Sequence, residues 1–268
     1  MAEKLKYFVN GQFRESKTDK WYDLHNPSTG EITGQAPCCT NDEVLEAIAA
    51  AKAAYPGWSA TPAIKRAQIL YRVRELILER MDELTMSVAK ENGKVWAESE
   101  GDVLKAKEGT ELATQVPSLM MGESIMDASR GYDTVKYREP LGVFAGIVPV
   151  NFPAMIPFGW MAPTCIAAGN TLVLKAASLT PKTAMLFAQL YKDAGVPDGV
   201  INVVTCSRNE INTILEHPDV KGITFVGSTP VGLKIYEKAA ANGKRCQALC
   251  QAKNHALVME DCALERTV

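Results

Sequence analysis

No residue between Glu139 and Lys175 carries a charge, and this uncharged stretch restricts the possible folds more than any other part of the sequence. A single apolar helix of that length would be able to span a bilayer. Prolines nevertheless stand at positions 149, 153, 157 and 163, and a proline inside a helix removes a backbone donor and clashes with the preceding turn. We therefore expect no membrane span here, but a buried strand, a loop, a helix and a second buried strand.

The composition indicates a globular protein that does not bind nucleic acid. The 268 residues include 31 acidic and 29 basic side chains, so the formal net charge is −2 and no global positive field is present. Apolar residues make up 47% and charged residues 22%, as in ordinary soluble proteins. The seven cysteines are an odd number without a Cys-x-x-Cys pair, and the first ten residues lack the apolar segment of a signal peptide. We therefore expect reduced thiols and a cytoplasmic protein.

The first half of the chain predicts a small β-region followed by helices. Short β-type runs separated by turn signals over residues 5–35 indicate a hairpin or meander. A first helix is expected to begin at Thr40 or Asn41 and to end before Pro56. Apolar residues at helical spacing from position 64 predict a long amphipathic helix, broken near Asp82 and ended around Gly93, and a further helix is expected over residues 97–114.

The second half predicts strands that alternate with helices. A strand with one wet face is expected over residues 133–138, and the apolar run 141–148 predicts a buried strand of the parallel type. The elements expected after it are helix 157–168, strand 171–174, helix 182–194, strand 200–204, helix 209–215, strand 222–225, helix 231–241 and strand 256–259. This rhythm is typical of α/β proteins with a doubly wound, Rossmann-like parallel sheet, here with an N-terminal helical region and hairpin.

The loop after the first buried strand presents one carboxamide between two prolines, in Pro149-Val150-Asn151-Phe152-Pro153. In open parallel sheets, ligands bind outside the carboxyl ends of the strands. Asn151 is therefore a candidate donor to an oxyanion, and capping of the next helix is the competing interpretation.

Two further loops follow strands of the expected sheet. Lys175 ends the second buried strand and can donate to ribose hydroxyls or a phosphate, with Ser178 offering a hydroxyl at a helix start; a lysine that merely reaches solvent is the alternative. Gly227 and Ser228 precede a helix that starts with Pro230, and the exposed amides of such a start accept a pyrophosphate, although a plain helix cap has the same pattern. The three histidines form no metal-ligand spacing, and we expect no metal site.

Together, the order and spacing of these loops resemble the aldehyde dehydrogenase superfamily over nearly the whole chain. The motifs that carry the resemblance are Val150-Asn151-Phe152-Pro153, Ala167-Ala168-Gly169-Asn170-Thr171, Gly195-Val196-Pro197-Asp198-Gly199 and Phe225-Val226-Gly227-Ser228-Thr229. Within it, Glu91-Asn92-Gly93-Lys94, Pro117-Ser118-Leu119-Met120-Met121-Gly122 and Ala252-Lys253-Asn254-His255 are similar to the CoA-acylating methylmalonate-semialdehyde dehydrogenases.

The resemblance implies an NAD-binding domain, an aldehyde substrate, coenzyme A (CoA) as co-substrate and a homo-oligomer. It implies that Val148, Pro149 and Val150 contact NAD, together with Lys175, Ser178, Gly227 and Ser228, and that Asn151 is catalytic. Residues 1–130 are then the N-terminal hairpin and helical part, 131–260 the Rossmann-like core, and 261–268 the start of a catalytic domain outside this sequence.

Four departures from the family pattern bear on function. Leu249-Cys250-Gln251-Ala252-Lys253 lacks the glutamate that activates water in most members, which suits transfer of the acyl group to CoA. Ala177-Ser178-Leu179 replaces a stretch with an acidic ribose ligand, and Lys105 stands in place of an arginine that grips a carboxylate bidentately. The interval from Asn151 to Lys175 is one residue longer than usual, which shifts the helix between them.

The resemblance places the nucleophilic cysteine beyond Val268, so the 268 residues are expected to lack it. Cys246 and Cys250 precede a strand in this interpretation. The resemblance places Cys250 on the nicotinamide side, so it is either a nucleophile or a buried thiol without a role in catalysis. Two alternatives to the CoA-acylating enzyme stay open. They are another aldehyde dehydrogenase with a different aldehyde and a cofactor-binding module without turnover.

Overall fold

The computed structural model describes residues 3–267, and its centre is a seven-stranded sheet of order β11-β10-β7-β8-β9-β1-β2. Residues 1, 2 and 268, the outer ends of the expected first and last segments, lie outside the described residues. The strands are β1 (Tyr7–Val9), β2 (Gln12–Arg14), β3 (Trp21–His25), β4 (Ile32–Pro37), β5 (Glu123–Ser129), β6 (Tyr132–Lys136), β7 (Val143–Ile147), β8 (Thr171–Lys175), β9 (Ile201–Val204), β10 (Val220–Val226) and β11 (Arg245–Leu249). The helices are α1 (Asn41–Ala60), α2 (Ala63–Glu79), α3 (Met81–Asn92), α4 (Trp96–Ala113), α5 (Val116–Leu119), the π-helix η1 (Ile156–Met161), α6 (Ala162–Ala167), α7 (Lys182–Asp193), α8 (Arg208–Glu216), α9 (Thr229–Ala241) and α10 (Leu264–Thr267).

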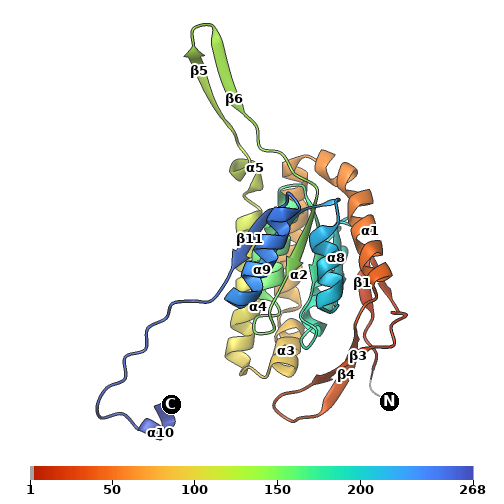
Figure 1. The fold of residues 1–268 in the computed structure, drawn as a ribbon, viewed down its shortest axis with the longest axis vertical. Coiled ribbons are helices and arrows are strands. Elements are labelled where there is room, and N and C mark those ends of the chain that lie inside the picture. The colour runs from red at the N-terminus through yellow and green to blue at the C-terminus, as the bar shows by residue number, and fades with distance from the viewer. Residues whose placement is uncertain (1–2, 268) are drawn as a thin grey trace.

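Helices cover both faces of the sheet, which confirms the doubly wound α/β fold (Figure 1). Strands β7 to β11 run parallel, and β1 joins them antiparallel to β9. Successive residues of β8 serve opposite faces: Leu172 and Leu174 pack with α2, η1 and α7, whereas Val173 packs with α1 and α8. The uncharged stretch folds as expected into β7, a loop, η1 with α6, and β8. Among the described residues, no helix combines the length and the apolar character needed to cross a bilayer.

The N-terminal strands form two hairpins, as expected, but one of them extends the main sheet. Strand β1 turns at Asn10 and Gly11 into β2, and Phe8 pairs with Val203 of β9. Strands β3 and β4 pair separately. The expected break in the long helix is present, because α2 ends before Arg80 and α3 ends at Gly93 in the left-handed conformation.

The first helix does not end before Pro56, and that prediction is wrong. Helix α1 continues to Ala60 with Pro56 inside it. An interior proline costs about 3 kcal/mol. Trp58, 2% exposed, offsets that cost because its ring is buried and its Nε1–H donates to the carbonyl of Ile166 at 2.9 Å.

The strand expected at 133–138 does not have a buried face. Strand β6 pairs with β5 in a hairpin that projects from the body, and every residue of both strands is exposed (Figure 1). The alternation of Val135 and Tyr137 with charged residues therefore marks a two-sided exposed ribbon. The boundary expected at residue 130 falls at the turn of this hairpin.

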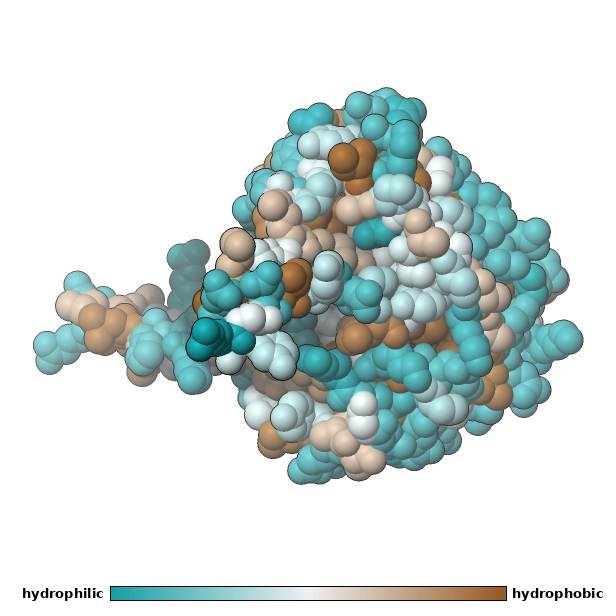
Figure 2. Space-filling view, turned by 90° about the horizontal axis from the view of Figure 1, so that it is seen from above, coloured by the Kyte–Doolittle hydropathy of each residue, from teal (hydrophilic) through white to brown (hydrophobic). Residues whose placement is uncertain are grey.

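The strand expected at 256–259 is absent, and the last strand of the sheet is instead β11. Residues 250–260 form an exposed tail that leads to α10. Figure 2 shows this tail leaving the body, with brown apolar residues on it. Within the part of the chain that the structure describes, its apolar run has no neighbouring strand with which to form backbone hydrogen bonds. Cys246 thus lies within a strand, and Cys250 follows it.

Candidate functional site

The candidate site lies where the strand order reverses. The chain passes from β7 to β8 on one side of β7, whereas β10 lies on the other side, with Ile147 paired to Phe225. The crevice outside the carboxyl ends of two such strands is the usual ligand site of open α/β sheets. The loop after β7 carries Asn151, and the loop after β10 carries Gly227 and Ser228. The structure therefore brings together two of the three loops singled out from the sequence, and β8 ends beside them.

The Asn151 side chain is exposed and makes no hydrogen bond among residues 3–267. The next helix begins only at Ile156, after an N-cap at Met155, so the interpretation of Asn151 as a helix cap is wrong. The adjacent Val150 carbonyl accepts hydrogen bonds from Asn92 Nδ2 at 2.8 Å and from Thr180 Oγ1 at 3.3 Å. The loop is thus fixed through its backbone, and the carboxamide is left free to donate.

The motif Glu91-Asn92-Gly93-Lys94 holds this loop from below. The Glu91 carboxylate accepts from the backbone amides of Lys182 at 2.8 Å and Thr183 at 3.0 Å, and so caps α7. Burial raises the pKa of Glu91 to about 7, although these two amides favour the charged form. Gly93 then reverses the chain at a φ of 76°, where a residue with a side chain would be strained.

A buried ion pair completes the support. Lys94 Nζ lies 3.0 Å from Asp102 Oδ2, and the other oxygen of Asp102 accepts from the backbone amide of Met155 at 2.7 Å. The same ammonium lies 4.0 Å from the ring centre of Phe152. Burial raises the pKa of Asp102 despite these partners, so desolvation outweighs the attraction of Lys94. Sequence reasoning used this motif only as a family signature. The available signal was a lysine directly after a glycine turn, with an aspartate eight residues further along.

A cavity of about 420 Å³ opens between α8 and α9, beside the end of β8. That volume lies within the range of small-molecule sites. Its lining includes Ile147 at the end of β7, Lys175 at the end of β8 and Cys206 just after β9. Burial lowers the pKa of Lys175. Lys175 thus lines the pocket that the nucleotide-binding interpretation requires.

The remaining sequence candidates lie around this edge, but the local structure at one of them, Ser178, differs from the prediction. Val148 is buried and its amide lies 3.4 Å from the Lys175 carbonyl, and the half-buried Pro149 follows it. Ser178 does not start a helix as expected. It lies in a turn after β8, and α7 begins at Lys182 with Pro181 as N-cap.

Helix α9 begins beside the cavity without a side-chain cap. Ser228 is the N-cap residue, but its hydroxyl makes no capping hydrogen bond, and Pro230 stands in the first turn. The first amides of the helix are therefore available to an anion. A Cβ at Gly227 would lie 2.5 Å from Phe225 Cζ, so this position has no room for a side chain unless the buried ring shifts.

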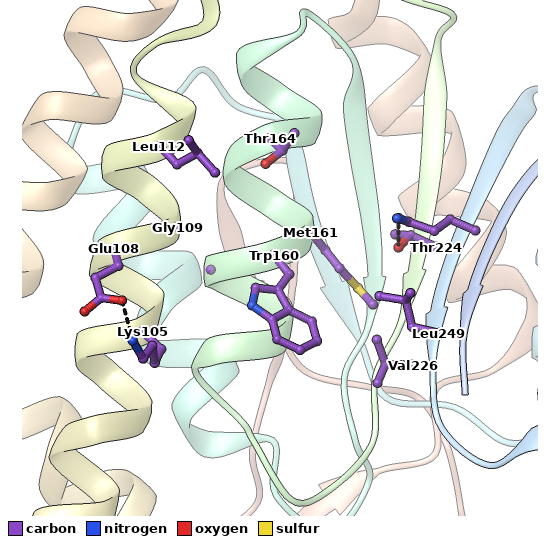
Figure 3. A pocket seen from close by; sticks show the side chains of 12 residues that line it. Lys105, Glu108, Gly109, Leu112, Trp160, Met161, Thr164, Thr224, Val226 and Leu249 are labelled. Atoms are coloured by element: carbon purple, nitrogen blue, oxygen red, sulfur yellow. Dashed lines mark hydrogen bonds and ion pairs between the residues drawn. The ribbon is translucent and has the colours of Figure 1, made fainter. Parts of the chain in front are cut away.

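A second depression lies on the opposite face of the sheet. It has a volume of about 420 Å³ between α4, η1 and the ends of β10 and β11, and Figure 3 shows Trp160 at its centre. Lys105 lines it, but its Nζ lies 2.6 Å from Glu108 Oε2 on the same helix. The ammonium that the resemblance assigns to substrate binding is thus paired within α4.

None of the seven cysteines is disulfide-bonded in the structure. Burial raises the pKa of Cys39, Cys165 and Cys206 to about 12, so these thiols stay protonated near neutral pH. Cys250 is exposed, and its sulfur would lie 2.5 Å from a Cβ added at Gly232 of α9. The structure also has no group of three potential metal ligands within residues 3–267.

Comparisons with known proteins agree on one family. Residues 13–268 match the profile of the aldehyde dehydrogenase family. The chain is 44% identical over 264 residues to the rat mitochondrial acylating methylmalonate-semialdehyde/malonate-semialdehyde dehydrogenase, covering 98% of this chain and 49% of the relative. It is 46% identical to malonate-semialdehyde dehydrogenase 2 of Geobacillus kaustophilus, covering 100% and 55%.

Solved structures give the same result. A putative methylmalonate-semialdehyde dehydrogenase from Sinorhizobium meliloti, complexed with NAD, has a TM-score of 0.93 and 36% identity, covering 100% of this chain and 54% of that one. An NADP-dependent enzyme of E. coli has a TM-score of 0.88 and 34% identity, covering 92% and 51%. The chain thus spans about half the length of the relatives it matches.

Proposed function

The chain belongs to the aldehyde dehydrogenase family, and we propose that it forms the NAD-binding portion of a CoA-acylating semialdehyde dehydrogenase. The observation that carries the proposal is that a free carboxamide, Asn151, and an uncapped helix start at Ser228 follow two paired strands at the same edge of the sheet. An oxyanion donor and an anion-binding helix end are the two groups that dinucleotide-dependent aldehyde oxidation needs from this part of the enzyme.

The residues present fit a dinucleotide. The cavity between α8 and α9 is large enough for part of one, Lys175 donates from its floor, and the free amides of α9 suit a pyrophosphate. When bound, NAD accepts the hydride that leaves the aldehyde carbon.

In the proposed reaction, the carbonyl oxygen gains negative charge when a cysteine thiolate bonds to the carbonyl carbon. The Asn151 amide donates to that oxygen, and the fixed Val150 backbone keeps the donor in place before the charge develops. We assign the thiolate to a part of the enzyme outside these residues, as the family resemblance implies. Within residues 3–267, burial keeps the Cys39, Cys165 and Cys206 thiols protonated.

Transfer to CoA is supported by what lies after β11. Leu249-Cys250-Gln251-Ala252-Lys253 has no carboxylate that would activate water against a thioester, and the rat relative is named as acylating. The aldehyde class follows from the semialdehyde names of the relatives. The Lys105–Glu108 pair leaves the recognition of a substrate carboxylate to other groups.

We also propose a cytoplasmic homo-oligomer. The free thiols are typical of a reducing compartment. The projecting hairpin exposes apolar side chains that a second copy would cover, among them Ile125 (58%), Met126 (79%) and Tyr132 (72% exposed).

A non-catalytic cofactor-binding module is the second candidate, and the protonated thiols favour it. An assay for NADH with an aldehyde and CoA, run on the complete enzyme that contains this portion, distinguishes the two: turnover that depends on Asn151 identifies an enzyme.

Calorimetry with NAD tests the proposal directly. The Gly227→Val variant is expected to lose NAD binding, because its side chain meets the Phe225 ring and displaces the adjoining helix start where the pyrophosphate is placed. Gly101→Val in α4 is the control, since a Cβ there meets nothing within 4 Å. Equal NAD affinity in the wild type and the Gly227→Val variant would sink the assignment.

A further inference from the structure

We propose that a groove between α3 and α7 binds a medium-chain aliphatic carboxylate, at a site separate from the cavity between α8 and α9. The groove has a volume of about 470 Å³, which lies within the range of small-molecule sites. Leu5 and Phe13 of the N-terminal region close it on one side. No step of the proposed reaction uses this groove, so the site goes beyond the proposed function.

Helices α3 and α7 form the two walls of the groove and run in opposite directions. At one end, the Glu91 carboxylate near the end of α3 accepts from the amides of Lys182 and Thr183, which begin α7. At the other end, Arg80 directly before α3 lies 3.4 Å from Asp193, the last residue of α7. Residues early in one helix therefore lie opposite residues late in the other.

Both helices present side chains to the groove at helical spacing. The lining residues are Glu83, Met86, Ser87 and Lys90 of α3, and Lys182, Met185, Leu186 and Gln189 of α7. Because the helices are antiparallel, the two lysines lie at one end, the apolar side chains in the middle, and Glu83 and Gln189 at the other end. Seven residues of α-helix span about 10 Å, about the length of an extended eight-carbon chain.

The middle of the groove suits an alkyl chain. Met86 is 42% exposed and Phe13 is 39% exposed, so apolar surface on both sides of the groove is in contact with water. Met185, 6% exposed, forms part of the floor. An alkyl chain would remove this surface from water, and methionine side chains adapt to the shape of such a ligand.

The lysine end of the groove suits an anion. Within residues 3–267, the Lys90 ammonium makes neither an ion pair nor a hydrogen bond. The Lys182 ammonium donates to the carbonyl of Thr33 at 2.7 Å and has no carboxylate partner in the same part of the chain. Both cations therefore have donors left for a ligand carboxylate.

The acidic side chains of the lining do not cancel these cations. Glu83 lies 2.7 Å from Arg80 Nε at the opposite end. Both oxygens of Glu91 are engaged by the backbone amides of α7. Glu3, on the exposed N-terminal segment, is the remaining acid of the lining, and two lysines outnumber it. The arrangement favours an anionic head over a cationic one.

Calorimetric titration of the protein with octanoate, octanol and octylamine tests the proposal. Octanoate is expected to bind, octanol more weakly, and octylamine most weakly, because the three probes share one chain and differ in the charge of the head. The affinity for octanoate is expected to be the same with and without saturating NAD, since NAD is assigned to the cavity between α8 and α9.

Two variants locate the site, each with a matched control. Lys90→Gln is expected to weaken octanoate about ten-fold, as for the loss of one charge-assisted contact, and to leave octanol unchanged; Lys65→Gln, at an exposed lysine of α2, leaves both unchanged. Met86→Glu is expected to abolish octanoate binding, because it places a carboxylate in the path of the chain. Leu78→Glu is its control, since Leu78 is also 42% exposed but lies on α2.

Four results overturn the proposal: no binding of octanoate, octylamine or octanol as tight as octanoate, displacement of octanoate by NAD, or an unchanged affinity in Lys90→Gln. None of them bears on the proposed function, which is tested by the binding of NAD itself.

Discussion

Removal of the Asp102 carboxylate tests the support of the Asn151 loop. Asp102→Ala leaves the Lys94 ammonium, 15% exposed, without its partner and the amide of Met155 without its acceptor. Breaking a buried ion pair on one side costs about 3–5 kcal/mol, because the remaining charge stays desolvated. We expect the free energy of unfolding to fall by that amount.

The double variant Lys94→Met/Asp102→Ala separates the attraction between the two charges from the cost of burying them. Desolvation already outweighs attraction at Asp102, so removal of both charges is expected to cost at least about 1 kcal/mol less than the sum of the single variants. Urea unfolding followed by tryptophan fluorescence measures the free energy of unfolding of each variant. Glu108→Ala, which removes an exposed pair on the same helix, is the control and is expected to cost less than about 1 kcal/mol.

A loss for Asp102→Ala no larger than that for Glu108→Ala refutes the reasoning, as does strict additivity in the double variant. Either result means that the loop is held without the Lys94–Asp102 pair.

Three further predictions follow from the site. Asn151→Ala is expected to lower kcat of the complete enzyme about 10²–10³-fold. The urea midpoint is expected to stay the same, since the exposed Asn151 amide makes no hydrogen bond within residues 3–267. An unchanged kcat excludes Asn151 as an oxyanion donor. Folding raises the pKa of Glu91 from 4.5 to about 7. The free energy of unfolding of the wild type, relative to that of Glu91→Gln, is therefore expected to fall by about 3 kcal/mol as the pH rises from 4.5 through 7. A difference in urea titrations that does not change with pH contradicts this. A maleimide at pH 7.5 is expected to label Cys250 well before Cys39 and Cys206, as judged by peptide mass spectrometry, and equal labelling contradicts the burial of these two thiols.

The sheet was predictable because its inner strands are buried on both faces. Continuous apolar runs such as 141–148, followed by helical periodicity, specify β7 to β10 and the helices between them. The edge strand β11 was missed because Arg245 and Gln247 alternate with Cys246 and Ala248, so that the run reads as polar. The apolar run 256–259 was wrongly predicted to be a strand. Its side chains are apolar, but no neighbouring strand lies beside it to pair with its backbone.

Long-range contacts explain what the sequence did not reveal about the site. The sequence pattern identified Asn151 and Gly227 from their places after strands. It did not predict that Asp102, 53 residues away along the chain, accepts from the Met155 amide, or that Glu91 caps α7. Likewise, Pro56 stays inside α1 because Trp58 binds Ile166, a contact between residues 108 positions apart.

The π-helical turn in η1 gives the chain tolerance to a change in length. The amide of Ala162 donates to the carbonyl of Pro157, five residues back, so this turn holds one residue more than an α-helical turn. A turn of this kind takes up one residue more than an α-helical turn, and the strands on either side, β7 and β8, pair in an unbroken parallel register. A change of one residue in the length of this uncharged segment is therefore expected to be absorbed within the helix, without a shift of the loop before it or of the strand after it.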